Sequence, residues 1–189
     1  MAEHPADDEP SLARSPRGVP PELARRFPAT YARLRSMAAT ILHDERTDHT
    51  LEATALVHEA FLRLSENNRT FSSDDEFVAV AAAQMRHVLV DHARRAKALK
   101  RGGAHRPASL DTSALGVPAS AGRPVDLLDL DELLCRLETL EPRQARLVEM
   151  HLFGSLPIER AATLLGIAER TAFNDWRMAR AWLLSRLTD

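Results

Sequence analysis

The stretch AATLLGIAERTAFNDWRMARAWL, residues 161–183, carries the clearest structural signal in the chain. A short apolar segment is followed by Gly166, a residue type that tolerates the left-handed backbone of a tight turn. Ala162 lies four residues before that glycine and is small enough for close helix contact, while Ile167 can plug the corner. The stretch therefore predicts two helices joined by a tight turn, the helix-turn-helix arrangement.

The second of these helices has two different faces. Ala172, Trp176, Ala179 and Leu183 recur at i, i+4, i+7 and i+11, which predicts one buried stripe. The outward side then carries a set of polar and aromatic residues, namely Arg170, Thr171, Phe173, Asn174 and Arg177.

These outward residues suit the major groove of DNA. Asparagine can bond adenine with two hydrogen bonds, arginine can bond guanine or phosphate, and an exposed phenylalanine can meet a thymine methyl. Ala168 stands where a capping Ser or Thr would stabilise the helix by about 1 kcal/mol. Because an ordinary four-helix domain can contain the same Ala-x3-Gly turn, the motif alone leaves both interpretations open.

Length and composition limit the other classes of protein. A chain of 189 residues with 44% hydrophobic content can bury one core or two small ones. The longest apolar run, FVAVAAA from Phe77, is far shorter than a membrane span, and the N-terminus has no signal-peptide pattern, so we expect a cytoplasmic protein without a membrane partner. The single cysteine, Cys135, excludes a disulfide framework, and we expect it to be buried.

No motif of an enzyme is present in the sequence. The eight histidines are scattered, and neither an HExxH motif, a Gly-rich phosphate loop nor a nucleophile elbow is found. We therefore expect no catalytic residue, no metal, no cofactor and no small-molecule substrate.

Charge is strongly segregated along the chain, although the net charge is only −2. Residues 86–106 carry seven Lys/Arg against Asp91, whereas residues 126–141 carry six Asp/Glu against Arg136. Residues 170–186 are again basic, with four arginines against Asp175. Such alternation is typical of a protein that meets an anionic partner at two places, although a block of charge can also be a solvated face.

The pattern of apolar residues predicts an all-α fold of two small helical domains joined by a flexible linker. Residues 1–20 are expected to be a disordered tail, and residues 21–103 a domain of three helices. The first helix is expected to follow Pro28, and the third to run from Phe77 to about Lys100, capped by Ser73 or Asp74. Residues 104–125 have the composition of a linker, and residues 126–189 are expected to form a four-helix domain that contains the helix-turn-helix.

Three stretches together resemble a known family. They are ALVHEAFLRL (55–64), AAAQMRHVLVDHARRAKALKRGG (81–103) and the long segment LETLEPRQARLV to WLLSRL (137–187). In this order, with a linker between them, they are similar to the extracytoplasmic-function (ECF) subfamily of bacterial sigma-70 factors. The resemblance implies an RNA polymerase sigma factor that directs promoter-specific transcription initiation, with core polymerase and promoter DNA as partners.

The resemblance also implies roles for individual residues. His58, Glu59 and Arg63 would contact the polymerase clamp from the helix LVHEAFLRL, residues 56–64. Helix-turn-helix residues would read the minus-35 element, and the loop after residue 65 would receive a flipped base of the minus-10 element. Amides and a ring suit an unpaired base, and basic residues suit the backbone. The minus-10 set is Asn67, Asn68, Phe71, Arg86, His87, Arg94 and Arg95.

Thr54 and Ala55 occupy positions that are usually acidic in the wider family. Phosphorylation of Thr54 or Thr50 would add negative charge near a helix N-terminus, where anions are favoured. One hypothesis is therefore that a Ser/Thr kinase switches polymerase binding on, and another partner of the family is an anti-sigma factor. In the alternative, Thr50 is a helix cap and Thr54 an ordinary surface residue.

A second function stays open beside the sigma factor. The chain could be a stand-alone helix-turn-helix transcriptional regulator, with the N-terminal half as a sensor or dimerisation domain. Such a regulator would bind a palindromic duplex tightly without polymerase.

Overall fold

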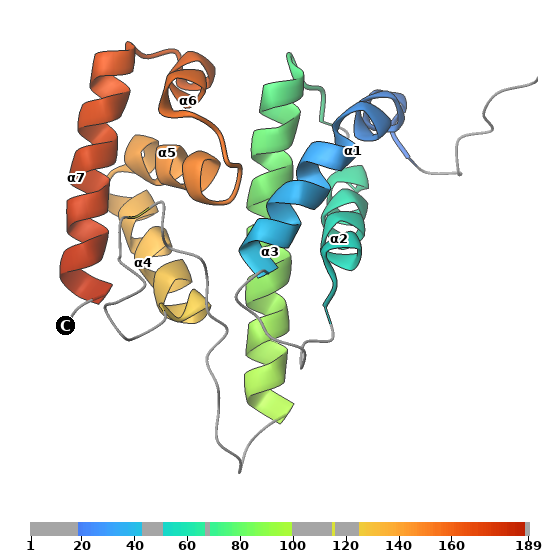
Figure 1. Cartoon of the computed structure of the whole chain (residues 1–189), viewed down its shortest axis with the longest axis horizontal. Helices are drawn as coiled ribbons and strands as arrows, with labels where there is room; N and C mark the ends of the chain where they lie inside the picture. The colour runs from blue at the N-terminus through green and yellow to red at the C-terminus, as the bar shows by residue number, and fades with distance from the viewer. Residues whose placement is uncertain (1–18, 43–50, 67–68, 100–114, 116–124, 188–189) are drawn as a thin grey trace, which may run out of the picture.

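The computed structural model describes residues 19–42, 51–66, 69–99, 115 and 125–187. This part of the chain contains seven α-helices and no β-strand, so the all-α prediction is confirmed for it. The helices are α1 (Pro21–Leu42), α2 (Ala53–Ser65), α3 (Asp74–Leu99), α4 (Leu127–Leu140), α5 (Pro142–Leu152), α6 (Ile158–Leu165) and α7 (Glu169–Leu187). In Figure 1, α3 stands between α1 and α2 on one side and α4 to α7 on the other.

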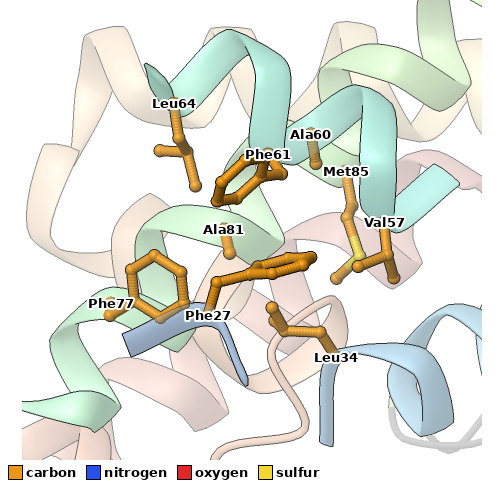
Figure 2. Close-up of a pocket in the computed structure, with 9 residues that line it drawn as sticks. All are labelled: Phe27, Leu34, Val57, Ala60, Phe61, Leu64, Phe77, Ala81 and Met85. Atoms are coloured by element: carbon orange, nitrogen blue, oxygen red, sulfur yellow. The ribbon is translucent and has the colours of Figure 1, made fainter. Parts of the chain in front are cut away.

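The helices α1, α2 and α3 pack around an apolar core (Figure 2). The side chains that meet there are all apolar, and the rings of Phe27 and Phe61 lie 4.2 Å apart between their centroids. A hollow remains between them, lined by Phe27, Leu34, Val57, Ala60, Phe61, Leu64, Phe77, Ala81 and Met85. Because no polar group lines this hollow, it belongs to the packing of the core.

The prediction that the first helix follows Pro28 is wrong, because α1 begins at Pro21 and contains Pro28. An interior proline removes one helix hydrogen bond and costs about 3 kcal/mol. Burial of Leu23 opposes that cost. Arg26 adds hydrogen bonds to the Phe71 carbonyl at 2.8 Å and to the Asp74 carboxylate at 2.5 Å. These contacts join the first two turns of α1 to the start of α3.

The helix α3 begins with the expected cap. The Glu76 amide donates to Ser73 Oγ at 3.1 Å, and the Glu76 carboxylate accepts from the amide and hydroxyl of Ser72 at 2.7 and 2.6 Å. The first turn is acidic and the last turn contains Lys97, which suits the helix dipole. This capping stabilises the start of α3. The helix then continues for 26 residues and contacts helices of both halves of the molecule.

The C-terminal half is built from α4 to α7. The carboxylate of Asp126 accepts from the Leu128 amide at 2.9 Å and caps α4, while Pro142 occupies the first turn of α5. Cys135 is exposed on α4, so the prediction that it is buried is wrong. Leu130, Leu134 and Leu137 form the core face of α4, and residue 135 falls beside that face.

The two predicted domains lie against each other in this structure. The larger buried cluster contains residues of α1 to α3 and of α4, α5 and α7, and it includes Leu115 from the predicted linker. Arg180 of α7 donates to the Leu115 carbonyl at 2.6 Å. The predicted limits of the tail and the linker fall largely outside the described residues.

Candidate nucleic-acid interface

The turn between α6 and α7 has the geometry that its sequence requires. Gly166 adopts φ +66° and ψ 32°, a left-handed conformation that glycine reaches without strain. Its amide donates to the carbonyls of Ala162 and Thr163, and the Ile167 amide donates to the Ala162 carbonyl at 3.1 Å. Ala162 is buried, so the backbones approach closely at this corner. The turn therefore fixes the direction in which α7 leaves α6.

One side of α7 is buried, largely as its spacing predicted. Ala172, Ala179 and Leu183 are fully buried. Trp176 is only partly buried and meets the ring of His151 edge-on, with 4.6 Å between the centroids. This packing fixes the rotation of α7 about its axis.

The other side of α7 faces outward. Arg170, Phe173, Asn174 and Arg177 are exposed, with Phe173 at 46% of its full exposure, whereas Thr171 is half-buried. Arg177 donates to Asn174 Oδ1 at 3.2 Å, so these two side chains lie side by side. A surface of this kind offers amide and guanidinium donors and one apolar ring to a groove.

Asp175 is a residue of this helix to which the sequence pattern assigned no role. It is buried, and Arg143 of α5 donates to its two oxygens at 2.7 and 3.2 Å. The hydrogen bond with Asp175 and its negative charge raise the pKa of Arg143 above the usual value. The negative charge of Asp175 in α7 is thus neutralised by an arginine of α5, on the side of α7 that faces the rest of the domain. The pairing could not be found from spacing, because 32 residues separate the partners.

The basic residues of α3 differ in how accessible they are. His87 and Arg95 are exposed. Arg86 is only 6% exposed and donates to the carboxylates of Asp131 and Glu149. Burial lowers the pKa of the Arg86 guanidinium, but the hydrogen bond of Asp131 and the charge of Glu149 outweigh this and raise it above its usual value. Arg94 is largely exposed and reaches Asp131 at 3.2 Å.

The loop before α3 is described only in part. Asn67 and Asn68 lie outside the described residues. Phe71 is buried, and its ring meets that of Phe77 edge-on with 5.2 Å between the centroids. In this arrangement the ring is part of the core and is not available to stack on a base, although the sequence suggested that role. The guanidinium of Arg69 lies 5.8 Å from the Phe71 ring centroid.

The exposed side of α2 contains a residue that the sequence pattern missed. His58 is exposed, Glu59 is half-buried, and Arg63 is paired with Asp91 of α3 at 2.7 Å. Leu62 is 60% exposed, which is unusual for a large apolar side chain on a packed helix. Leu62 falls outside the spacing of the buried residues Leu56, Val57, Ala60 and Leu64, so a large apolar residue on the polar side of the helix was the signal that could have identified it.

Thr54 lies half-exposed in the first turn of α2, and Thr50 lies outside the described residues. The residue that caps α2, Glu52, makes no side-chain capping bond, and the first turn contains no acidic residue. In the described part of the chain, no group of three His, Cys, Asp or Glu residues could hold a metal ion. Nor is any helix there long and apolar enough to cross a bilayer.

The sequence of the chain matches one known protein family. The family described as ECF sigma factor matches residues 18–189, which is nearly the whole chain. The chain belongs to the ECF sigma factor family. No curated protein and no solved structure matched it.

This sigma factor directs promoter-specific transcription initiation by binding core RNA polymerase and promoter DNA. The match does not favour the stand-alone regulator, because it extends over α1 to α3 as well as over the helix-turn-helix. As a sigma factor it regulates transcription.

Proposed function

We propose that the outward face of α7 reads the minus-35 element of the promoter. The observation that carries this proposal is the exposure of Asn174 and Arg177 side by side beyond the Gly166 turn. Asn174 is suited to adenine, Arg170 and Arg177 to guanine or phosphate, and Phe173 to a thymine methyl. Thr171 is half-buried at the edge of this face and is suited to a phosphate contact.

We further propose that α3 and the loop before it hold the minus-10 element. His87 and Arg95 are exposed, and Arg94 is largely exposed, so their positive charge is available to the phosphate backbone. Arg86 belongs to the same set in sequence, but its guanidinium is occupied within the chain. Asn67, Asn68 and Phe71 remain the proposed contacts to an unpaired base, and Phe71 would have to leave its site beside Phe77 to stack on that base.

The polymerase-binding surface that we propose is the exposed side of α2. His58 and Glu59 offer polar contacts, and Leu62 adds an exposed apolar side chain between them and Arg63. A surface that combines one apolar anchor with polar neighbours is typical of a protein interface. Arg63 would contribute while paired with Asp91, or by exchanging that partner. Because its partner would be RNA polymerase, we propose that the protein acts in the cytoplasm.

Run-off transcription with purified core polymerase tests this function. The chain should co-purify with core polymerase and start transcription from promoters that the reconstituted holoenzyme selects. Leu62→Asp should abolish co-purification with core, whereas Leu140→Asp, which changes an equally exposed leucine on α4, should not. Normal core binding by the Leu62→Asp protein would remove α2 from the polymerase interface. No transcription by the unaltered chain would contradict the function itself.

Regulation by phosphorylation of Thr54 is a finer proposal for the same surface. The first turn of α2 lacks both acidic residues and a side-chain cap, so a phosphate there would meet free amides and the positive end of the helix dipole. We expect Thr54→Glu to bind core polymerase more tightly than Thr54→Ala. Equal binding and transcription by both proteins would leave an anti-sigma factor, or the level of expression, as the means of control.

A further inference from the structure

The contact between α3 and the C-terminal half is charged and buried at its centre. Arg86 donates from Nε and Nη2 to Asp131 Oδ1 at 3.0 and 2.8 Å, and from Nη1 to Glu149 Oε1 at 2.7 Å. Arg86 and Asp131 are 6% and 5% exposed. All three guanidinium nitrogens of Arg86 are therefore engaged with acids of α4 and α5.

The same aspartate also holds a second basic residue of α3. Arg94, two turns further along the helix, donates to the other oxygen, Asp131 Oδ2, at 3.2 Å. Arg86 and Arg94 both belong to the basic set assigned above to the minus-10 element. Asp131 and Glu149 thus engage guanidinium donors that are also suited to phosphate oxygens, since carboxylate and phosphate bind the same donors.

Near the start of α3 the charges of the contact are reversed. Asp75 of α3 accepts from Arg160 of α6, with Nε at 2.9 Å, and from Arg33 of α1 at 2.8 Å. Between the two charged ends, Ala79 of α3 packs into the cluster formed by α5, α6 and α7. Because the acid lies on α3 at one end and on α4 and α5 at the other, only one register satisfies both pairings. Arg86 and Asp131 are buried in this contact, whereas Arg160 is exposed, so breaking the pair at Arg86 by removing one partner has the larger cost.

This closed arrangement is too small for both promoter elements at once. The minus-10 and minus-35 positions lie about 25 base pairs apart, which is about 85 Å of B-form DNA. A compact chain of this length has a radius of gyration of about 16 Å. The predicted linker of 104–125 could extend to about 70 Å if stretched, so separating the halves would allow the span.

We propose that this face of α3 is one binding surface with two alternative occupants. In the closed state it holds Asp131 and Glu149, and in the initiating complex it holds the phosphates of the promoter. The two acids form a latch that keeps the buried Arg86 from DNA until the halves separate, while the largely exposed Arg94 is held by a single hydrogen bond to Asp131. The proposal rests on the function above in one respect, the assignment of Arg86 and Arg94 to the minus-10 element.

The test uses the full chain, and its first measurement needs no DNA. In a Cys135→Ser background, Ala32→Cys on α1 and Ala181→Cys on α7 provide two exposed sites for fluorophores, and energy transfer reports their separation. The unaltered latch should give one short separation. Asp131→Asn with Glu149→Gln should produce a population with longer separations. A charge-matched control, Glu132→Gln with Glu138→Gln, changes two exposed acids of α4 and should keep the short separation.

The second measurement is binding of the free protein to a fluorescent fork DNA from a promoter that the holoenzyme transcribes. If about nine tenths of the unaltered protein is closed, the Asp131→Asn, Glu149→Gln protein should bind about tenfold more tightly. The control removes the same number of negative charges. Its gain in affinity for the promoter fork should therefore be no larger than its gain in affinity for a DNA of unrelated sequence. Circular dichroism should show unchanged helix content, and if it does not, Glu149→Gln alone provides the same test at a less buried position.

The outcomes separate the latch from the function on which it rests. An unchanged separation and unchanged DNA affinity in the Asp131→Asn, Glu149→Gln protein would overturn the latch. Longer separations without tighter DNA binding would overturn the competition with phosphate. If the opened protein binds more tightly, and adding Arg86→Ala and Arg94→Ala leaves that affinity intact, the minus-10 assignment fails while the conformational change stands.

Discussion

Asp175 of α7 is bound by two hydrogen bonds from Arg143 of α5. The guanidinium donates from Nε to Asp175 Oδ2 at 2.7 Å and from Nη2 to Oδ1 at 3.2 Å. The carboxylate is buried one residue after Asn174, so an unpaired charge there would oppose the approach of DNA. The pair both neutralises that charge and ties α7 to α5.

Arg143→Ala should lower the free energy of unfolding by about 1–3 kcal/mol, because it leaves a buried carboxylate without its charged partner. It should also weaken minus-35 binding, since α7 loses a support. Thermal unfolding and promoter binding by the holoenzyme measure the two effects. Asp175→Asn in the same protein should restore part of the stability, and Arg146→Ala, which removes an exposed arginine of α5, should change stability little. A loss equal to that of Arg146→Ala would mean that the pair does not support α7.

Asn174→Ala should weaken some minus-35 sequences by about 1–3 kcal/mol and leave others unaffected, because a base contact discriminates between sequences. Arg95→Ala, at an exposed position of α3, should instead weaken all promoters alike. Holoenzyme binding to a panel of minus-35 variants distinguishes the two patterns. Equal losses over the whole panel would remove Asn174 from the readout.

Gly154→Ala should destabilise the turn between α5 and α6. A Cβ at position 154 would lie 2.4 Å from the Met150 carbonyl oxygen, which belongs to the backbone and cannot move alone. We expect a loss of about 1–3 kcal/mol in chemical denaturation, which is typical of an overpacked site. Gly166→Asn is the comparison, because nothing lies within 4 Å of a Cβ there and asparagine tolerates the positive φ. If Gly154→Ala were as mild as Gly166→Asn, the steric argument would fail.

The contact through Asp75 should depend on pH. The hydrogen bond from Arg33, and then that from Arg160, lower the pKa of Asp75 below its ordinary value of 3.8, although burial opposes them. The unfolded chain therefore binds the proton more readily than the folded one. The stabilisation is complete above the ordinary pKa and is lost as the pH falls through the lowered value. The stability difference between the unaltered and Asp75→Asn proteins should shrink on acidification below about pH 4. A difference that stays constant in acid would contradict this linkage.

Leu115→Ala should cost about 2–5 kcal/mol, the usual range for removing a fully buried leucine. The loss should appear in thermal unfolding, because Leu115 belongs to the cluster shared by both halves. Leu140→Ala, at an exposed leucine of α4, should change stability by no more than about 0.5 kcal/mol. A negligible effect of Leu115→Ala would show that the predicted linker does not contribute to the core.

Local features of the sequence predicted much of the fold and part of the site. The period of Ala172, Ala179 and Leu183 predicted the buried stripe of α7, and Gly166 predicted the left-handed turn. Ser73 was correctly predicted as a cap of α3, although the helix begins at Asp74 and not at the predicted Phe77. These predictions succeed because helix periodicity, capping and turn conformation depend on residues only a few positions apart.

Longer-range contacts could not be predicted in the same way. Pro28 looked like a boundary, but Arg26 and Leu23 gain enough from α3 and the core to keep it inside α1. Phe71 looked like a surface ring, but it packs on Phe77.

By itself, the sequence determined that the chain is helical, where the turn between α6 and α7 lies, and which family it resembles. Only the tertiary structure decided that Arg86 is held by Asp131 and Glu149, and that Arg143 neutralises Asp175. The reason is physical: whether a charged side chain is free or paired depends on which distant helix packs against it, and nothing in the local sequence specifies that partner.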